Sequence, residues 1–129
     1  MTSLEDNNET AEAPPAAVFA GLQVMKTRAD FVAASKARYQ TAPGLTVQMR
    51  NRDDGNPSVR VGFTCSKKVG NAVARNRAKR RLREIARLDL PALAEPGHDY
   101  VLIGKKDVTA NRPFEDLRAD LARALAKLA

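Results

Sequence analysis

The residues of this chain with the clearest chemical potential are cations gathered in one stretch. Residues 67–87 hold nine Lys or Arg and a single acid, Glu84, a balance of +8, whereas all 129 residues together carry +7. The remainder of the chain therefore sums to −1. Guanidinium and ammonium groups bind phosphate oxygens, so charge that is focused in one element indicates a polyanionic partner.

An amphipathic helix is predicted to position these cations. Gly70 supplies a turn, Asn71 is a good N-cap, and no Gly or Pro interrupts the chain from there to Leu88. At about 100° per residue, one side of this helix is apolar and the other is basic. The apolar stripe consists of Ala74, Ala78, Leu82, Ile85 and Ala86. The polar face consists of Asn76, Arg77, Lys79, Arg80, Arg83 and Arg87, with Arg75 and Arg81 at its flanks.

A solvated surface helix is the alternative interpretation of this pattern. Solvated faces usually mix charges, because acid–base pairs at i,i+4 support a helix and like charges oppose it by roughly 0.2–0.5 kcal/mol each. Here like charges recur at that spacing, since Lys79 lies four residues from both Arg75 and Arg83. A polyanion would offset the repulsion, so we favour nucleic-acid binding.

Length and composition indicate one domain with a modest core, at 14.0 kDa and a pI near 10.0. A membrane surface is disfavoured as the partner, because the chain has no Trp and no apolar run of spanning length. Residues 1–6 lack the basic and apolar regions of a signal peptide. The single cysteine, Cys65, excludes an internal disulfide and suits a reducing compartment. We therefore expect a cytoplasmic protein.

Residues 1–20 are predicted to be a disordered acidic tail, with the folded domain occupying residues 21–129. The tail carries four acids, no base, and Pro14-Pro15 among alanines. It could screen the basic helix when nucleic acid is absent, or be an extension with no specific role.

A short helix is predicted over residues 27–37, with Thr27 and Asp30 spaced as a capping box. Phe31 lies on this helix. A lone helical Phe is usually a core residue, but it can also be a platform on which a base stacks at the edge of a groove. The sequence leaves both roles open.

Two strands with alternating side chains follow. The first runs from Leu45 to Arg50 after Pro43-Gly44, and the second covers residues 59–66. Residues 51–57 have the composition of a hairpin loop, so we expect the two strands to be neighbours. Alternation gives each strand one apolar face toward a core and one small polar face. In the second strand the apolar side chains are Val59, Val61, Phe63 and Cys65, which makes Cys65 a packing residue.

The last third of the chain is predicted to be scaffold. Asp89-Leu90-Pro91 is expected to end the basic helix, and residues 100–104 form a short apolar run typical of a central buried strand. Pro113 opens a final helix. Its apolar positions recur at helical spacing and are Phe114, Leu117, Leu121, Leu125 and Leu128.

The sequence contains no pattern for metal binding or catalysis. One Cys and one His exclude the usual Cys/His metal spacings. A Ser-His-Asp arrangement would need His98, which lies in a predicted turn and is expected at the surface. The acids that are candidates for holding Mg²⁺, Asp99 and Asp107, are isolated from one another. We therefore expect no catalytic residue and no protein metal site.

The central stretch resembles the bacterial ribonuclease P protein family. Weaker similarity extends over residues 22–128 and leaves the tail outside it. The segments that carry the close resemblance are Arg60-Val61-Gly62-Phe63, Ser66-Lys67-Lys68-Val69-Gly70-Asn71-Ala72-Val73 and Arg75-Asn76-Arg77-Ala78-Lys79-Arg80-Arg81-Leu82-Arg83-Glu84.

The resemblance implies an α+β fold, a single two-layer domain of α-β-β-β-α-β-α order with a left-handed β-α-β crossover around the basic helix. The general rule for such crossovers favours the opposite hand. It also implies a function: an RNA-binding subunit that assists a catalytic RNA in removing 5′ leaders from precursor tRNA. The partners would be the ribonuclease P RNA and precursor tRNA, with no DNA and no membrane. Mg²⁺ would be held by the RNA and the substrate, and the protein would lower the Mg²⁺ requirement.

The family's site residues carry over by position. The RNA-binding set is Lys67, Lys68, Arg75, Asn76, Arg77, Lys79, Arg80, Arg81 and Arg83. The resemblance also implies a leader cleft between the sheet and the first helix, where Phe31 and Ser35 stand at the family's aromatic positions. Strand alternation assigns Thr46, Gln48, Thr64 and Ser66 to the cleft side. Ser35 and Gln48 stand where family members often have aromatic residues. Leader binding is therefore expected to depend less on stacking and more on hydrogen bonds.

Two other functions compete with this one. A basic ribosomal or ribosome-assembly protein could share a basic helix on a small α+β scaffold. A DNA-binding protein could place the helix in a major groove, but this chain lacks the partner helix of a helix-turn-helix and would leave the polar strand face unused.

Overall fold

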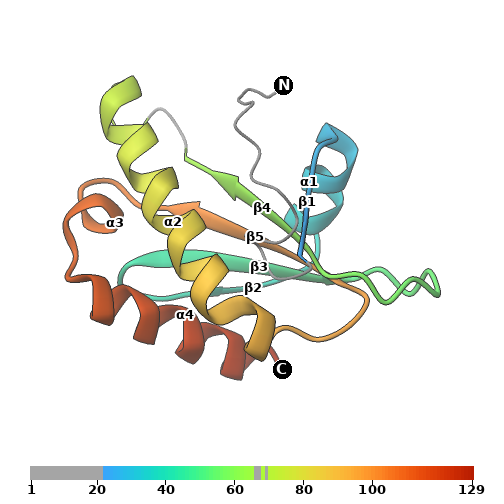
Figure 1. The fold of residues 1–129 in the computed structure, drawn as a ribbon. Coiled ribbons are helices and arrows are strands. Elements are labelled where there is room, and N and C mark those ends of the chain that lie inside the picture. Colours follow the sequence, from blue (N-terminus) through green and yellow to red (C-terminus); the bar gives the residue numbers. More distant parts are fainter. Residues whose placement is uncertain (1–21, 66–67, 69) are drawn as a thin grey trace.

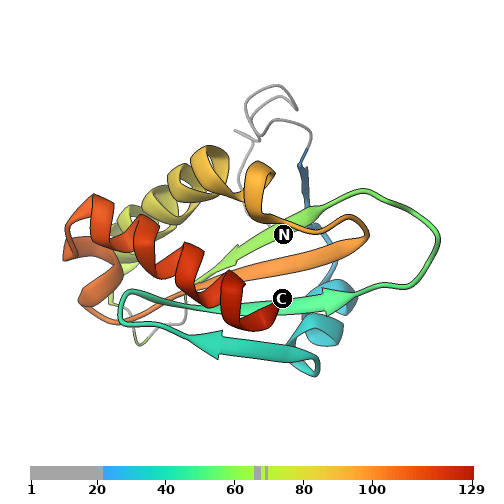
Figure 2. The same ribbon diagram turned by 90° about the horizontal axis from the view of Figure 1, so that it is seen from below.

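A computed structural model describes residues 22–65, 68 and 70–129 of the chain. Five strands form one sheet in the order β1-β4-β5-β3-β2. The strands are β1 (Gln23–Val24), β2 (Arg38–Thr41), β3 (Leu45–Asn51), β4 (Arg60–Thr64) and β5 (His98–Gly104). The helices are α1 (Arg28–Ser35), α2 (Ala72–Leu93), α3 (Val108–Asn111) and α4 (Phe114–Leu128). Helices α2 and α4 cover one face of the sheet and α1 lies against the other (Figures 1 and 2).

The expected α+β order is confirmed, with the short elements β1 and α3 added to it. Strands β4 and β5 are parallel neighbours joined through α2. In Figure 1 both strands point leftward, α2 lies in front of them, and β5 lies below β4. This connection is therefore left-handed, the rare hand for a β-α-β unit.

The prediction that the first two long strands are neighbours is wrong. Strand β5 lies between them, antiparallel to β3 and parallel to β4. Residues 51–57 do turn the chain, with positive φ at Asp53 and Gly55, but they connect two strands separated by a third. The apolar β5 takes this place because it is buried on both sides, where it can pair with each neighbour.

Strand β2 is the first of the three strands that the family order places after α1, but the residue patterns did not predict its position. It pairs antiparallel with β3, and the Ala42 N–H donates to the Leu45 carbonyl (2.8 Å) to close a hairpin through Pro43-Gly44. The sequence of β2, Arg-Tyr-Gln-Thr, has no apolar alternation, because three of its four residues are exposed at the sheet edge.

The predicted helix boundaries shift by a few residues. Helix α1 ends at Ser35, and the Thr27 hydroxyl accepts a hydrogen bond from the Asp30 N–H as predicted (3.2 Å). Helix α2 continues through Pro91 to Leu93, which corrects the prediction that it ends at Asp89–Pro91. Pro91 lies in the last turn, where it forfeits only one hydrogen bond. The bond from the Ala94 N–H to the Leu90 carbonyl (2.8 Å) still closes the helix over the buried Leu90.

The main core lies between the sheet and helices α2 and α4. It includes the alternate residues of β3 that were assigned to the apolar face, and all four leucines of α4. Cys65 packs against this core, and burial raises the pKa of its thiol. These contacts confirm the predicted parity of β3 and β4 and the packing role of Cys65.

Candidate nucleic-acid interface

Helix α2 carries the predicted basic residues, and Asn71 fixes where it begins. The Asn71 side-chain oxygen accepts a hydrogen bond from the Ala74 N–H (3.0 Å). The side of the helix that faces the sheet and α4 buries Ala78, Leu82, Ile85, Ala86 and Leu90. Ala74, the first residue of the predicted stripe, is half-buried. This packing turns the opposite side of the helix to solvent.

The solvent side of α2 forms a basic helix face, made of Asn76, Arg77, Lys79, Arg80 and Arg83. Asn76, Arg77 and Arg80 are exposed, and the other two are half-buried. Within the described part of the chain, the first four make no hydrogen bond or ion pair through their side chains. The Arg83 guanidinium carbon lies 5.9 Å from the centroid of the Phe63 ring. The face thus keeps its donors available for an external acceptor such as phosphate.

Two arginines beside this face are partly engaged. Arg87 donates to Glu84 (Nε···Oε1 3.2 Å), and this hydrogen bond holds the pKa of Glu84 below its usual value. The only acid of the basic stretch is thereby paired at the C-terminal end of the face. Arg75 donates from Nη1 to the Gly70 carbonyl (3.1 Å), which folds it back over the start of the helix.

Arg81 is anchored inside the protein. Its Nη1 donates to the Ala110 carbonyl (2.7 Å), its Nη2 donates to the Arg112 carbonyl, and its guanidinium lies 5.8 Å from the centroid of the Phe114 ring. The planar fork therefore ties α2 to the segment between α3 and α4. Sequence projection placed Arg81 at the flank of the apolar stripe, and the family resemblance placed it among the RNA-binding residues. Its contacts indicate a role in holding the helix.

Two of the predicted residues, Lys67 and Ser66, lie outside the described residues. Lys68 is described and exposed. The predictions for Lys67 and Ser66 therefore stay predictions.

The second surface is the polar sheet face, on the side of the sheet away from α2 and α4. Cross-strand partners project to the same face, so the pairing registers define two rows across β4, β5, β3 and β2. One row is Gly62, Val101, Gln48 and Tyr39. The next row is Thr64, Ile103, Thr46 and Thr41. The structure therefore brings the predicted residues Thr46, Gln48 and Thr64 together on one face, each half-buried.

Phe31 lies at one end of this face and packs on it. A Cβ at position 62 would stand 2.6 Å from the Cε1 and Cζ atoms of the Phe31 ring. The ring also joins a small apolar cluster that is separate from the main core, formed by Met25, Ala34, Val101 and Ile103. Phe31 is half-buried. The structure thus shows that Phe31 packs on the sheet, and its role as a platform for a base stays a prediction.

The hydroxyl groups near this face differ in their availability. Ser35 is exposed on α1, but its hydroxyl donates to the Val32 carbonyl of the same helix (2.6 Å). Thr41 and Thr46 share a hydrogen bond between their hydroxyls (2.6 Å) across β2 and β3. One hydroxyl hydrogen of that pair is free for a further acceptor.

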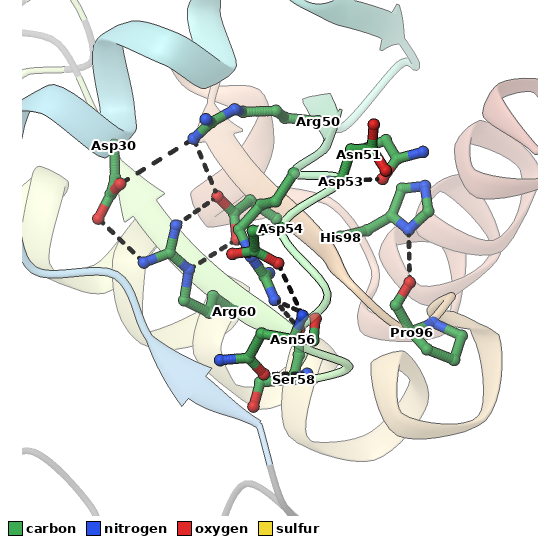
Figure 3. A network of polar contacts seen from close by, with 12 residues as sticks. Asp30, Arg50, Asn51, Asp53, Asp54, Asn56, Ser58, Arg60, Pro96 and His98 are labelled. Carbon is green, nitrogen blue, oxygen red and sulfur yellow. Dashed lines mark hydrogen bonds and ion pairs between the residues drawn. The ribbon is translucent and has the colours of Figure 1, made fainter.

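Sequence reasoning missed a charge network beside Phe31, in the row next to that of Gly62 (Figure 3). The fully buried Asp99 accepts from Arg60 (Nε···Oδ1 2.8 Å, Nη2···Oδ2 2.7 Å) and from Arg52 (Nη1···Oδ1 2.8 Å). Arg60 also donates to Asp30 of α1 (3.1 Å). Burial raises the pKa of Asp99, but the arginine hydrogen bonds outweigh it and hold this pKa below its usual value. No local sequence pattern predicts the network, because its members come from four places in the chain: α1, β4, β5 and the loop that follows β3.

Arg50 extends this network toward solvent. Its guanidinium lies 3.6 Å from Asp99 and 4.0 Å from Asp30, and about a third of its side chain is exposed. Arg52 also pairs with Asp54 (3.0 Å), so three arginines meet three carboxylates in this network beside α1.

Among the described residues, no three His, Cys, Asp or Glu side chains gather as metal ligands would. None of the described helices is both long and apolar enough to cross a membrane.

The fold and these surfaces define a small α+β domain built around one solvent-facing basic helix. A model of the family described as Ribonuclease P matches residues 19–129. A protein of Ruegeria pomeroyi named Ribonuclease P protein component is 62% identical over 109 residues, which are 84% of this chain and 87% of that protein. A Caulobacter vibrioides protein of the same name is 50% identical over 119 residues, covering 92% of this chain and 77% of that protein. The chain belongs to the ribonuclease P protein family.

Solved structures agree with this assignment. The RNase P protein from Thermotoga maritima superposes with a TM-score of 0.66 at 25% identity, over 79% of this chain and 93% of that one. The RNase P protein of Staphylococcus aureus shares the fold, with a TM-score of 0.67 at 24% identity over 81% of this chain and 94% of that one.

Proposed function

We propose that this chain is the RNA-binding subunit of ribonuclease P and assists its catalytic RNA in removing the 5′ leader from precursor tRNA. The observation that carries the proposal is the basic helix face. In a chain of this family, Asn76, Arg77, Lys79 and Arg80 present donors to solvent with no internal acceptor among the described residues. A phosphate backbone supplies the missing acceptors.

The two surfaces divide the binding between two RNAs. The basic helix face is the contact for the catalytic RNA, where cations neutralise backbone phosphates without reading sequence. The polar sheet face, with Phe31 at one end, is the contact for the single-stranded leader, because hydrogen-bonding side chains and a ring suit unpaired bases. Strand β4 ends at Thr64 and α2 begins at Ala72. The short connection between them makes the two surfaces neighbours along the chain.

The chemistry in this proposal belongs to the RNA. The two buried carboxylates, Asp99 and Asp120, are held by arginines through Arg60 and Arg112, so they serve the fold and are not placed to bind a metal ion. Mg²⁺ would be held by the RNA subunit and the substrate. The protein would screen phosphate repulsion between the RNAs, which lowers the Mg²⁺ concentration needed for cleavage. The single, half-buried Cys65 fits a cytoplasmic location for this activity.

Reconstitution tests this function. A bacterial ribonuclease P RNA and a precursor tRNA are incubated at low Mg²⁺ with and without the full chain, and release of the leader is followed. We expect cleavage to be faster with the chain present and absent when the RNA subunit is omitted. Equal rates with and without the chain at every Mg²⁺ concentration would contradict the proposal, and so would leader cleavage by the chain alone.

Matched variants locate the effect on the helix face. Arg80→Ala removes an exposed cation of the basic helix face, whereas Lys127→Ala removes an exposed cation of α4. We expect the first variant to need more Mg²⁺ than the parent chain and the second to behave as the parent does.

A further inference from the structure

Tyr39 is an aromatic side chain left in solvent on the polar sheet face. It is 69% exposed, whereas Tyr100, the only other tyrosine, is buried. Tyr39 lies on the edge strand β2 directly opposite Gln48 of β3, and Gln48 is in turn opposite Val101 of β5. The ring therefore projects to the face that carries Phe31, at the opposite end of the same row.

The rings of Phe31 and Tyr39 are separated by the width of the strands that lie between them. Gly62, under Phe31, and Tyr39 are three strand positions apart, or about 14 Å at roughly 4.8 Å between neighbouring strands. Stacked nucleotides rise by about 3.4 Å, so one nucleotide cannot contact both rings. Two rings at the ends of one row can hold two different bases of a strand that crosses the sheet.

The surroundings of Tyr39 favour an anionic, hydrogen-bonding occupant. The Thr41–Thr46 hydroxyl pair lies in the adjacent row of the same face. Arg50 of β3, two residues from Gln48, adds a partly exposed cation on this face. The carboxylates beside it, Asp30 and Asp99, are both paired with Arg60, so they do not repel a phosphate backbone as free acids would.

We propose that Tyr39 is a second stacking platform for single-stranded RNA, on which a leader nucleotide distinct from the one at Phe31 is held at the β2 edge. This inference rests on the proposed function and extends it. An aromatic ring stacks on any base through its π-face, so the contact adds affinity for the leader without selecting its sequence. The platform also supplies stacking on a face where Ser35 and Gln48 provide none.

The test uses the holoenzyme reconstituted with ribonuclease P RNA. Affinity is measured for mature tRNA and for precursor tRNAs whose leaders increase one nucleotide at a time. The variants are Tyr39→Ala, which removes the ring, Tyr39→Phe, which keeps it, and Gln40→Ala, on the same strand but facing the other side of the sheet. Melting temperature is recorded for each variant.

We expect Tyr39→Ala to weaken binding about 5- to 10-fold, the lower range for one stacked base, and only for leaders long enough to reach β2. Tyr39→Phe and Gln40→Ala should match the parent chain, and the melting temperature of Tyr39→Ala should stay unchanged because the ring is exposed. The loss should set in at a longer leader than the loss caused by Phe31→Leu.

Four results would overturn the inference. These are unchanged affinity in Tyr39→Ala, an equal loss for mature tRNA, a loss in Tyr39→Phe as large as in Tyr39→Ala, and a large drop in melting temperature. If Phe31→Leu still shows a leader-dependent loss in that case, only the second platform is refuted. If the holoenzyme cleaves no better than the RNA alone, the proposed function itself has failed.

Discussion

The ring of Phe31 occupies the space that a side chain at position 62 would need. Its Cε1 and Cζ atoms lie 2.6 Å from the place where a Cβ at Gly62 would stand, and real Cβ contacts are longer. The glycine thus lets α1 place an aromatic ring against β4. This contact sets the height and direction of the ring on the polar sheet face.

Gly62→Ala should therefore displace Phe31. We expect a destabilisation of about 1–3 kcal/mol, the usual cost of overpacking, together with weaker binding of leader-bearing precursor tRNA. Urea denaturation measures the loss of stability, and the affinity of the reconstituted holoenzyme for precursor tRNA measures the loss of leader binding. A variant with the parent's stability and leader affinity would show that the ring does not depend on this contact.

Phe31 itself should contribute to both folding and leader binding. Because it is half-buried in the small cluster, Phe31→Ala should cost less than the roughly 3–5 kcal/mol of a fully buried Phe. Phe31→Leu keeps apolar packing and removes the aromatic face, so it should lose about 1–3 kcal/mol of leader-dependent affinity with a smaller change in stability. Equal losses for mature and precursor tRNA in the leucine variant would assign Phe31 to the fold alone.

Arg81 should behave differently from the neighbouring Arg80. Arg81→Ala leaves the Ala110 and Arg112 carbonyls without their donor, so we expect a loss of about 1–3 kcal/mol in the free energy of unfolding. Arg81→Lys should restore little, because an ammonium group cannot reach two acceptors as a planar fork does. Arg80→Ala should change stability by less than about 0.5 kcal/mol. Urea denaturation of the three variants makes the comparison, and similar stabilities for all of them would refute the anchoring role.

Acid should weaken the fold through Asp99. Its pKa is lowered in the folded protein, so its ion pairs contribute stability above the ordinary carboxyl value of about 3.9, and that stability is lost as pH falls through the lowered value. Asp99→Asn should destabilise the protein at neutral pH by about 3–5 kcal/mol, because Arg60 and Arg52 lose their partner. It should also reduce the loss of unfolding free energy that the parent protein shows as pH falls, which we call the acid limb.

The control for this measurement is Asp53→Asn, in the exposed loop between β3 and β4, where the carboxylate makes no ion pair with the described residues. Denaturation followed between neutral pH and about pH 3 should show the parent's acid limb in the control. An unchanged limb in Asp99→Asn would mean that other carboxylates govern the acid sensitivity.

Local patterns predicted the elements that bury a regular stripe. The spacing of Ala78, Leu82 and Ile85 gave the buried side of α2, and the alternation of Val61 with Gly62 gave the two faces of β4. Both depend on a period of about 3.6 or 2 residues that the chain displays by itself. The cations of the basic helix face followed from the same projection.

Features that depend on distant partners escaped prediction. The turn residues 51–57 encode a reversal of the chain but not which strand will lie beside it, so the insertion of β5 could not be foreseen. Arg81 looks like any flanking cation until α3 brings the Ala110 carbonyl within reach. The left-handed crossover came from family resemblance alone, since general physical preference favours the other hand.

The salt dependence of RNA binding tests the central claim most directly, that the solvent side of α2 binds an RNA backbone. Affinity for ribonuclease P RNA is measured over a range of salt for the parent chain, Arg80→Ala, Arg83→Ala and the control Lys127→Ala. We expect the log–log slope to fall by roughly one unit for each of the two α2 variants, because each loses one phosphate contact, and to be unchanged in the control. Identical slopes in all four proteins would contradict the account and leave the basic helix face as a solvated surface.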